Sequence, residues 1–215
     1  MSDSQTVTVF TTANLRGALD LLPRLATLIL RERRAAQGVT LLLDLGDTCS
    51  PESWLCRATH GRAPFLLLDA IGYDAAFIGG ETAPIAPDAF RRLRDRIVMP
   101  LFLWNRTSEL TRRDRTFAFA AGSATLAPGA AGFRINRGAP ALAAAEAGTI
   151  LLGDVPAEHI ARIEVRWPEC TIADARMIPL DAAEPPDPTI AAVLDLVTQE
   201  ARSLAQQQGE SYEPG

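Results

Sequence analysis

The chain has 215 residues, of which 47% are hydrophobic and 22% charged, a composition typical of a soluble globular domain. Its formal net charge of -5 argues against nucleic acid or an anionic membrane surface as a partner. All 21 basic residues are arginine, which excludes Schiff-base lysines and phosphate-binding lysine loops, and two histidines leave little material for a multi-histidine metal site.

The first half of the sequence alternates between strand-like and helix-like patterns. Runs of β-branched or apolar residues predict strands, whereas apolar residues that recur every three or four positions predict helices. This alternation is typical of βαβ units and of a largely parallel sheet. The predicted strands are 6–10, 39–45, 74–78 and 98–104, and the predicted helices are 19–34, 63–71 and 87–95.

The second half contains short strand-like segments separated by Gly and Pro, and it ends in one further helix. A hairpin is predicted around Pro168-Glu169-Cys170, and the turn at 185–188 opens the final helix. The sequence leaves much of the conformation of residues 107–147 open. We expect one domain over residues 6–205, followed by a polar, disordered tail at 206–215. The predicted strands are 116–120, 133–136, 149–152, 160–167 and 171–178.

Three cysteines, Cys49, Cys56 and Cys170, form no C-x-x-C pair and leave an odd count. We therefore expect reduced thiols that pack as small hydrophobic residues. The N-terminal segment has no secretory pattern, and no apolar run approaches the roughly 20 residues that span a bilayer. Together these features predict a cytoplasmic protein that does not insert into a membrane.

Polar side chains follow four successive predicted strands. In open α/β sheets, ligands bind outside the carboxyl ends of the strands. The loops at these four ends should therefore line a common crevice. They contain Asn14–Arg16, Asp47–Thr48, Gly79–Glu81 and Asn105.

Eight segments carry the most informative local sequence, five of them in the first half of the chain and three near its end. They are Phe10–Gly17, Pro23–Ile29, Leu43–Thr48, Leu68–Ala75, Ile78–Glu81, Arg162–Trp167, Ala175–Asp181 and Pro186–Ile190. In these segments the chain resembles the calcineurin-like metallophosphoesterases, and among them the bacterial 5'-nucleotidases. The resemblance covers residues 6–200, with a poor match between 107 and 147. It implies a layered α/β/β/α sandwich of mixed sheets with outer helices, in which two metal ions hydrolyse a phosphoester.

The sequence departs from that family where its members bind metal ions. The resemblance implies an Asp-x-His pair after the first strand, where this chain has Asn14 and Arg16. The Gly-Asp pair after the second strand is retained and ends in Asp47. After the third strand, the Asn and His positions of the family are occupied by Gly80 and Glu81.

The two histidines do not restore the missing ligands. The later segments in which the family carries two further metal-binding histidines are interpreted as deleted. His159 lacks the expected glycine-histidine context, and His60 lies in an unrelated loop, where its spacing from Cys56 is unspecific for a Cys-His nucleophile. We therefore expect no metal, no cofactor and no catalytic residue.

Arg16 disfavours metal binding further, because its guanidinium stays protonated and its positive charge repels a metal cation. A two-metal hydrolase holds its cations about 3.5–4 Å apart between a bridging carboxylate and His or Asn ligands. At about 4 Å and an effective dielectric near 20, one guanidinium repels a divalent ion by on the order of 8 kcal/mol. The sequence thus predicts a non-catalytic pseudoenzyme that serves as a binding or interaction module. Its vestigial site would contain Asn14, Arg16, Asp47, Gly80 and Glu81.

Several alternatives stay open. Arg16 can offer its guanidinium to a small anion or phosphorylated ligand in a metal-free pocket, or it can form an internal ion pair with Asp47 that fills the emptied space. The chain can also be an active phosphoester hydrolase with a rearranged site around Asp47 and Glu81, or a structural subunit for a protein partner. The arginine-rich stretch 91–96 contains an interleaved acid, so we interpret it as a solvated surface rather than a nucleic-acid patch.

Overall fold

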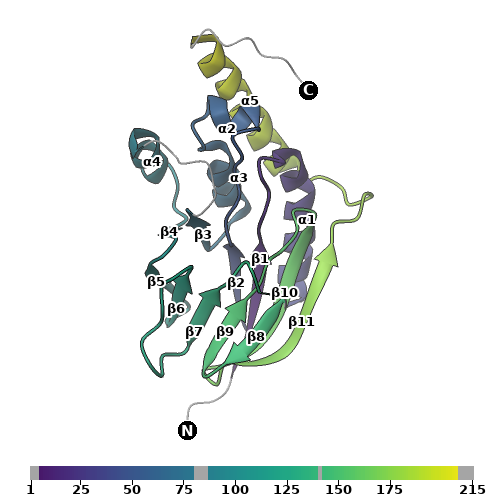
Figure 1. Ribbon diagram of the computed structural model, residues 1–215. Coiled ribbons are helices and arrows are strands. Elements are labelled where there is room, and N and C mark those ends of the chain that lie inside the picture. The colour runs from purple at the N-terminus through teal and green to yellow at the C-terminus, as the bar shows by residue number, and fades with distance from the viewer. Residues whose placement is uncertain (1–4, 80–86, 140–141, 208–215) are drawn as a thin grey trace.

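The structure, a computed structural model, describes residues 5–79, 87–139 and 142–207. Two mixed β-sheets lie face to face, and helices cover one of them (Figure 1). The strands of the first sheet are, in spatial order, β11 (Thr171–Pro179), β10 (His159–Trp167), β1 (Gln5–Thr12), β2 (Val39–Asp44), β3 (Ala75–Ile78) and β4 (Leu101–Leu103).

The first sheet has a parallel part and an antiparallel part. Strands β1 to β4 run parallel, as the alternating sequence pattern predicts. Strand β10 pairs antiparallel with both β1 and β11, which confirms the hairpin predicted around residues 168–170. The carboxyl ends of the parallel strands therefore lie at one edge of the sheet.

The second sheet is formed by the later, shorter strands. Its three central strands run parallel, and its two outer strands pair antiparallel with their neighbours. The carboxyl ends of the central strands consequently lie at one edge too. In spatial order the strands are β5 (Thr107–Arg112), β6 (Arg115–Ala121), β7 (Gly132–Ile135), β9 (Thr149–Leu152) and β8 (Ala143–Glu146).

The helices of the described residues pack on the outer face of the first sheet. Successive strand residues point to opposite faces. Phe10 and Leu42 accordingly pack with the helices, whereas Val9 and Leu41 face the second sheet. The helices are α1 (Leu22–Ala35), α2 (Trp54–Ala58), α3 (Ala63–Ile71), α4 (Pro87–Arg94) and α5 (Pro188–Gln207), with a short 3-10 helix, η1 (Leu19–Leu21).

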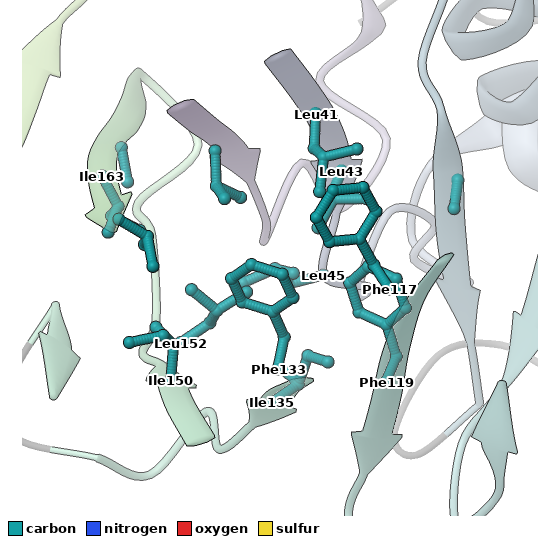
Figure 2. Close-up of a cluster of buried hydrophobic side chains, with 14 of the residues drawn as sticks. Leu41, Leu43, Leu45, Phe117, Phe119, Phe133, Ile135, Ile150, Leu152 and Ile163 are labelled. Atoms are coloured by element: carbon teal, nitrogen blue, oxygen red, sulfur yellow. The ribbon is translucent and has the colours of Figure 1, made fainter. Parts of the chain in front are cut away.

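The space between the two sheets is filled by aliphatic and aromatic side chains. Figure 2 shows leucines of β2, such as Leu41 and Leu43, pointing toward phenylalanines of the second sheet. The rings of Phe119 and Phe133 stack with their centroids 5.4 Å apart, and Phe133 stacks on Trp167 at 5.5 Å. Because β2 and β3 are buried on both faces, their sequences are almost continuously apolar.

The expected layered α/β class with mixed sheets is confirmed. Among the described residues, however, no helix covers the outer face of the second sheet. The loop 122–131 lies there instead, where it lines a pocket with Arg134 and Leu151. Strands β5 and β8 and helix α2 were not predicted. Helix α5 continues to Gln207, and residues 208–215 of the expected tail lie outside the described residues. None of the described helices has an apolar stretch long enough to cross a membrane.

The expectation that all three cysteines are reduced is wrong. Cys49 and Cys56 form a disulfide, with their Cα atoms 5.8 Å apart, because α2 brings the chain back toward the loop after β2. Cys170 is free and buried, and burial raises the pKa of its thiol. Disulfides are typical of oxidising compartments, so the cytoplasmic location stays a prediction.

Candidate functional site

Polar side chains from both sheets meet at the carboxyl ends of their parallel strands. Asn14 and Arg16 follow β1, and Asp47 follows β2, as the sequence predicts. Arg137 follows β7 and Asp154 follows β9 in the second sheet. The structure brings these five residues together through direct contacts. The remaining predicted site residues, Gly80 and Glu81, lie outside the described residues.

Backbone hydrogen bonds join the loop after β1 to the loop after β2. The amide of Asn14 donates to the carbonyl of Gly46 at 3.0 Å, and the amide of Arg16 donates to the carbonyl of Asp47 at 2.9 Å. Asn14, Arg16 and Asp47 all have left-handed backbone conformations, with φ values of +57°, +48° and +57°. Such conformations are unfavourable for residues with a Cβ and persist where the surrounding structure holds them. Both loops are therefore firmly placed.

The retained carboxylate, Asp47, is bound by two guanidinium groups. Its Oδ2 atom accepts a hydrogen bond from Arg16 Nε at 2.8 Å and lies 3.3 Å from Arg137 Nη2. The side chain of Asp47 is 8% exposed, whereas that of Arg16 is 65% exposed and that of Arg137 is 20% exposed. Arg137 is thus the more shielded of the two cations, and water screens the Arg16 pair more strongly.

The amide of Asn14 is fully used by its neighbours. Its Nδ2 group donates to Asp154 Oδ1 at 2.7 Å and to the carbonyl of Val155 at 2.9 Å, while its Oδ1 atom accepts from Arg137 Nη2. An aspartate at position 14 would place a second carboxylate against Asp154 and would have no hydrogen to donate. This network therefore favours asparagine over aspartate at position 14.

A second acid, Asp44, lies directly beneath these loops and is completely buried. It accepts hydrogen bonds from Thr12 Oγ1 at 2.9 Å, from Thr48 Oγ1 at 2.7 Å and from the amide of Gly46 at 3.1 Å. Burial raises the pKa of Asp44 from 3.8 to about 6, although these hydrogen bonds and the charge of Arg137 oppose the shift.

The hydroxyl of Tyr73 continues this buried network, 3.0 Å from Thr12 Oγ1. Burial and the nearby charge of Asp44 raise the pKa of the Tyr73 phenol. Burial therefore disfavours the charged forms of both acidic groups relative to water.

The donor set does not fit a metal pair. Among the residues that the structure describes, no group of three or more His, Cys, Asp and Glu side chains is able to hold a metal ion. The carboxylates of Asp47 and Asp154 already bind guanidinium groups and the amide of Asn14, which would compete with a metal ion for the same oxygens. His60 is exposed in the turn after α2.

Sequence reasoning missed Arg137, Asp154 and Asp44. Arg137 and Asp154 each follow a predicted strand, so the rule that ligands bind at the carboxyl ends of strands could have indicated them. The prediction of the site used only the first four strands. Asp44 stands inside the apolar run of β2, where nothing local shows that it lies beneath the site. Strands β7 and β9 reach the site and are followed by residues of opposite charge, Arg137 and Asp154.

Comparison with solved structures shows the fold. The chain is similar to a 5'-nucleotidase precursor from Thermus thermophilus, with a TM-score of 0.65 and 11% identity over 94% of this chain and 60% of that chain. It is also similar to the sulfate thiohydrolase SoxB from Thermus thermophilus, with a TM-score of 0.62 and 14% identity over 97% of this chain and 62% of that chain.

A third similar structure is the calcineurin-like phosphoesterase YfkN from Bacillus subtilis, with a TM-score of 0.59 and 11% identity over 94% of this chain and 99% of that chain. No protein-family model and no curated protein sequence matches this chain. The chain has the fold of the calcineurin-like phosphoesterases and 5'-nucleotidases, as the sequence predicts. It spans about 60% of the length of the first two structures.

Proposed function

We propose that this chain is a non-catalytic member of the metallophosphoesterase fold, which uses the fold as a binding or interaction module. The observation that carries the proposal is the pairing of Asp47 with two guanidinium groups, Arg16 and Arg137. In a two-metal hydrolase, a carboxylate at this edge of the sheets would bridge two cations. Here protein cations occupy its coordination sphere.

The electrostatic cost of a metal ion supports this proposal. An ion bound to Asp47 would lie about 4 Å from Arg137, and at an effective dielectric near 20 the repulsion is on the order of 8 kcal/mol before further screening. Displacing Arg137 from Asp47 would also deprive this largely buried guanidinium group of one of its two carboxylate partners. A divalent ion would thus oppose the interactions that hold the loops together.

We infer that the ion pairs close the site internally and do not form an anion pocket. The charges of Arg16 and Arg137 are balanced by those of Asp47 and Asp154, with Asp154 Oδ1 3.6 Å from Arg137 Nε. An incoming anion would therefore have to compete with two resident carboxylates. The guanidinium groups take the place that metal ions have in a hydrolase of this fold.

Metal content and turnover test the proposal together. Purified protein, analysed by elemental mass spectrometry, should contain well below one equivalent of manganese, zinc or iron per chain. It should hydrolyse neither a nitrophenyl phosphate nor a nucleoside monophosphate above background when manganese is added. A matched pair of variants, Asp47→Ala in the site and Glu158→Ala on an exposed loop, should be indistinguishable from the parent in both assays.

Stoichiometric metal that is lost in Asp47→Ala and kept in Glu158→Ala would overturn the proposal. Turnover with the same dependence would favour a rearranged hydrolase around Asp47 instead. A third reading, a structural subunit for a protein partner, would be favoured by a stable complex with a protein from the native host that survives substitution of Arg16.

A further inference from the structure

A second charged cluster is formed where the start of α3, the end of α4 and the middle of α5 meet. Arg62 directly precedes α3, Arg92 lies in α4, Arg96 follows α4, and Glu200 lies in α5. The Oε1 atom of Glu200 lies 3.6 Å from Arg62 Nη2 and 3.5 Å from Arg96 Nη1. We call these four residues the arginine cluster; none of them belongs to the site around Asp47.

Arg62 is the anchor of the arginine cluster. Its side chain is 7% exposed, which is unusual for an arginine, and its Nε group donates to the carbonyl of Thr59 at 2.9 Å. This hydrogen bond sets the orientation of the guanidinium plane. The terminal nitrogens of Arg62 are thereby directed to the region that Glu200 and Arg96 share.

The positive charge of the arginine cluster exceeds its negative charge. One carboxylate, Glu200, is shared through the same oxygen by Arg62 and Arg96, and Arg92 adds a third positive charge that acts on Arg62. Three guanidinium groups against one carboxylate leave an excess of two positive charges, on a chain whose net charge is -5.

Burial and the neighbouring charges change the pKa of Arg62. Burial lowers the pKa of Arg62, Glu200 opposes the shift, and the charges of Arg96 and Arg92 add to it. A shielded charge is costly unless it is paired and hydrogen-bonded. The stretch 91–96 is exposed at Arg92 and Arg96, as expected for a solvated surface, and these two arginines add positive charge next to the buried Arg62.

We propose that the arginine cluster binds an oxyanion of the phosphate class. A phosphate group carries up to two negative charges, which matches the excess charge, and its oxygens accept the paired hydrogen bonds that guanidinium groups donate. Glu200 holds the arginines together in the absence of the anion and competes with it. Arg62 supplies a fixed donor, the exposed Arg96 supplies a second donor from the solvent side, and Arg92 adds positive charge nearby.

Titration calorimetry with inorganic phosphate, at constant ionic strength against chloride, tests this proposal. Arg96→Gln should weaken phosphate binding by about tenfold, since a charge-assisted hydrogen bond is lost. Glu200→Gln should tighten it, because the competing carboxylate is removed. Arg166→Gln, which removes an exposed arginine from β10, is the matched control and should leave the affinity unchanged.

Arg62→Gln should abolish binding, and circular dichroism shows whether that variant is folded; Arg96→Gln carries the test if it is not. Absence of saturable phosphate binding in the parent protein would overturn the proposal. So would binding that is insensitive to Arg96→Gln and Glu200→Gln but lost in Arg137→Gln, because the anion would then bind at the Asp47 network. Metal content and turnover report separately on the proposed loss of catalysis.

Discussion

The buried carboxyl of Asp44 offers the sharpest test of the electrostatics of this fold. Asp44 is fully buried at the end of β2, and burial raises its pKa from 3.8 to about 6. Asp44→Asn keeps the shape of the side chain and removes its ionisation. Thr12 Oγ1, which donates to Asp44 Oδ2, can instead accept from the new amide and donate to Tyr73.

The magnitude follows from the pKa difference. A group whose pKa is raised on folding stabilises the native state below its unfolded pKa, and that contribution is lost as the pH rises through the folded pKa. A shift of about two units corresponds to about 3 kcal/mol. The parent protein should therefore lose up to about 3 kcal/mol relative to Asp44→Asn as the pH rises, and about 2 kcal/mol of this between pH 4 and pH 7.

Urea unfolding followed by tryptophan fluorescence measures this difference. The parent and Asp44→Asn are compared near pH 4 and near pH 7, because the other titrating groups cancel when the two proteins are subtracted. Glu52→Gln, at an exposed position, is the control and should show no such dependence. A constant difference between parent and Asp44→Asn would refute the reasoning. A difference of opposite sign would show that the hydrogen bonds and Arg137 hold Asp44 ionised.

Three further predictions concern the loops around the site. Arg137→Met should lower the free energy of unfolding by about 2–3 kcal/mol, measured in urea, because the buried side chain of Asp47 loses a charged donor. Dithiothreitol should lower the melting temperature of the parent, by an amount equivalent to about 2.5 kcal/mol for so short a loop, and should not affect Cys49→Ser. Gly17→Ala should destabilise by about 1–3 kcal/mol in thermal melts, since φ is +87° and the new Cβ would lie 2.3 Å from Ser53 Cβ.

Each of these has a clear contrary result. An Arg137→Met variant as stable as the parent would mean that Arg16 alone neutralises Asp47. A melting temperature that is unaffected by reductant would mean that the two cysteines are not bonded in solution. A fully stable Gly17→Ala would mean that the loop after β1 can move away from α2.

Most of the elements were predictable because they depend on local patterns. Helix α3 was predicted at its observed bounds, since apolar spacing and the closing glycine are both local signals. Strand β9 was predicted at its observed bounds for the same reason. Strands β5 and β8 were missed because their sequences are polar or alanine-rich, and they form strands only by pairing with β6 and β9.

The site was only partly predictable, for a related reason. Asn14, Arg16 and Asp47 could be placed together because parallel strands end at one edge of a sheet. Arg137 is 90 residues from Asp47, and Asp154 is 140 residues from Asn14. Their approach depends on how the second sheet lies on the first, which no local pattern encodes. The disulfide between Cys49 and Cys56 likewise depends on a turn that tertiary packing creates.

By itself, the sequence determined the alternation of elements, the class of the fold, the absence of lysine and the presence of only two histidines. These follow from composition and from hydrophobic periodicity, which reflect each residue's immediate neighbours. The tertiary structure alone decided which charges meet. Ion pairing falls off over a few ångströms, so the pairing of Asp47 with Arg137, and of Glu200 with Arg62, exists only once distant strands and helices have packed together.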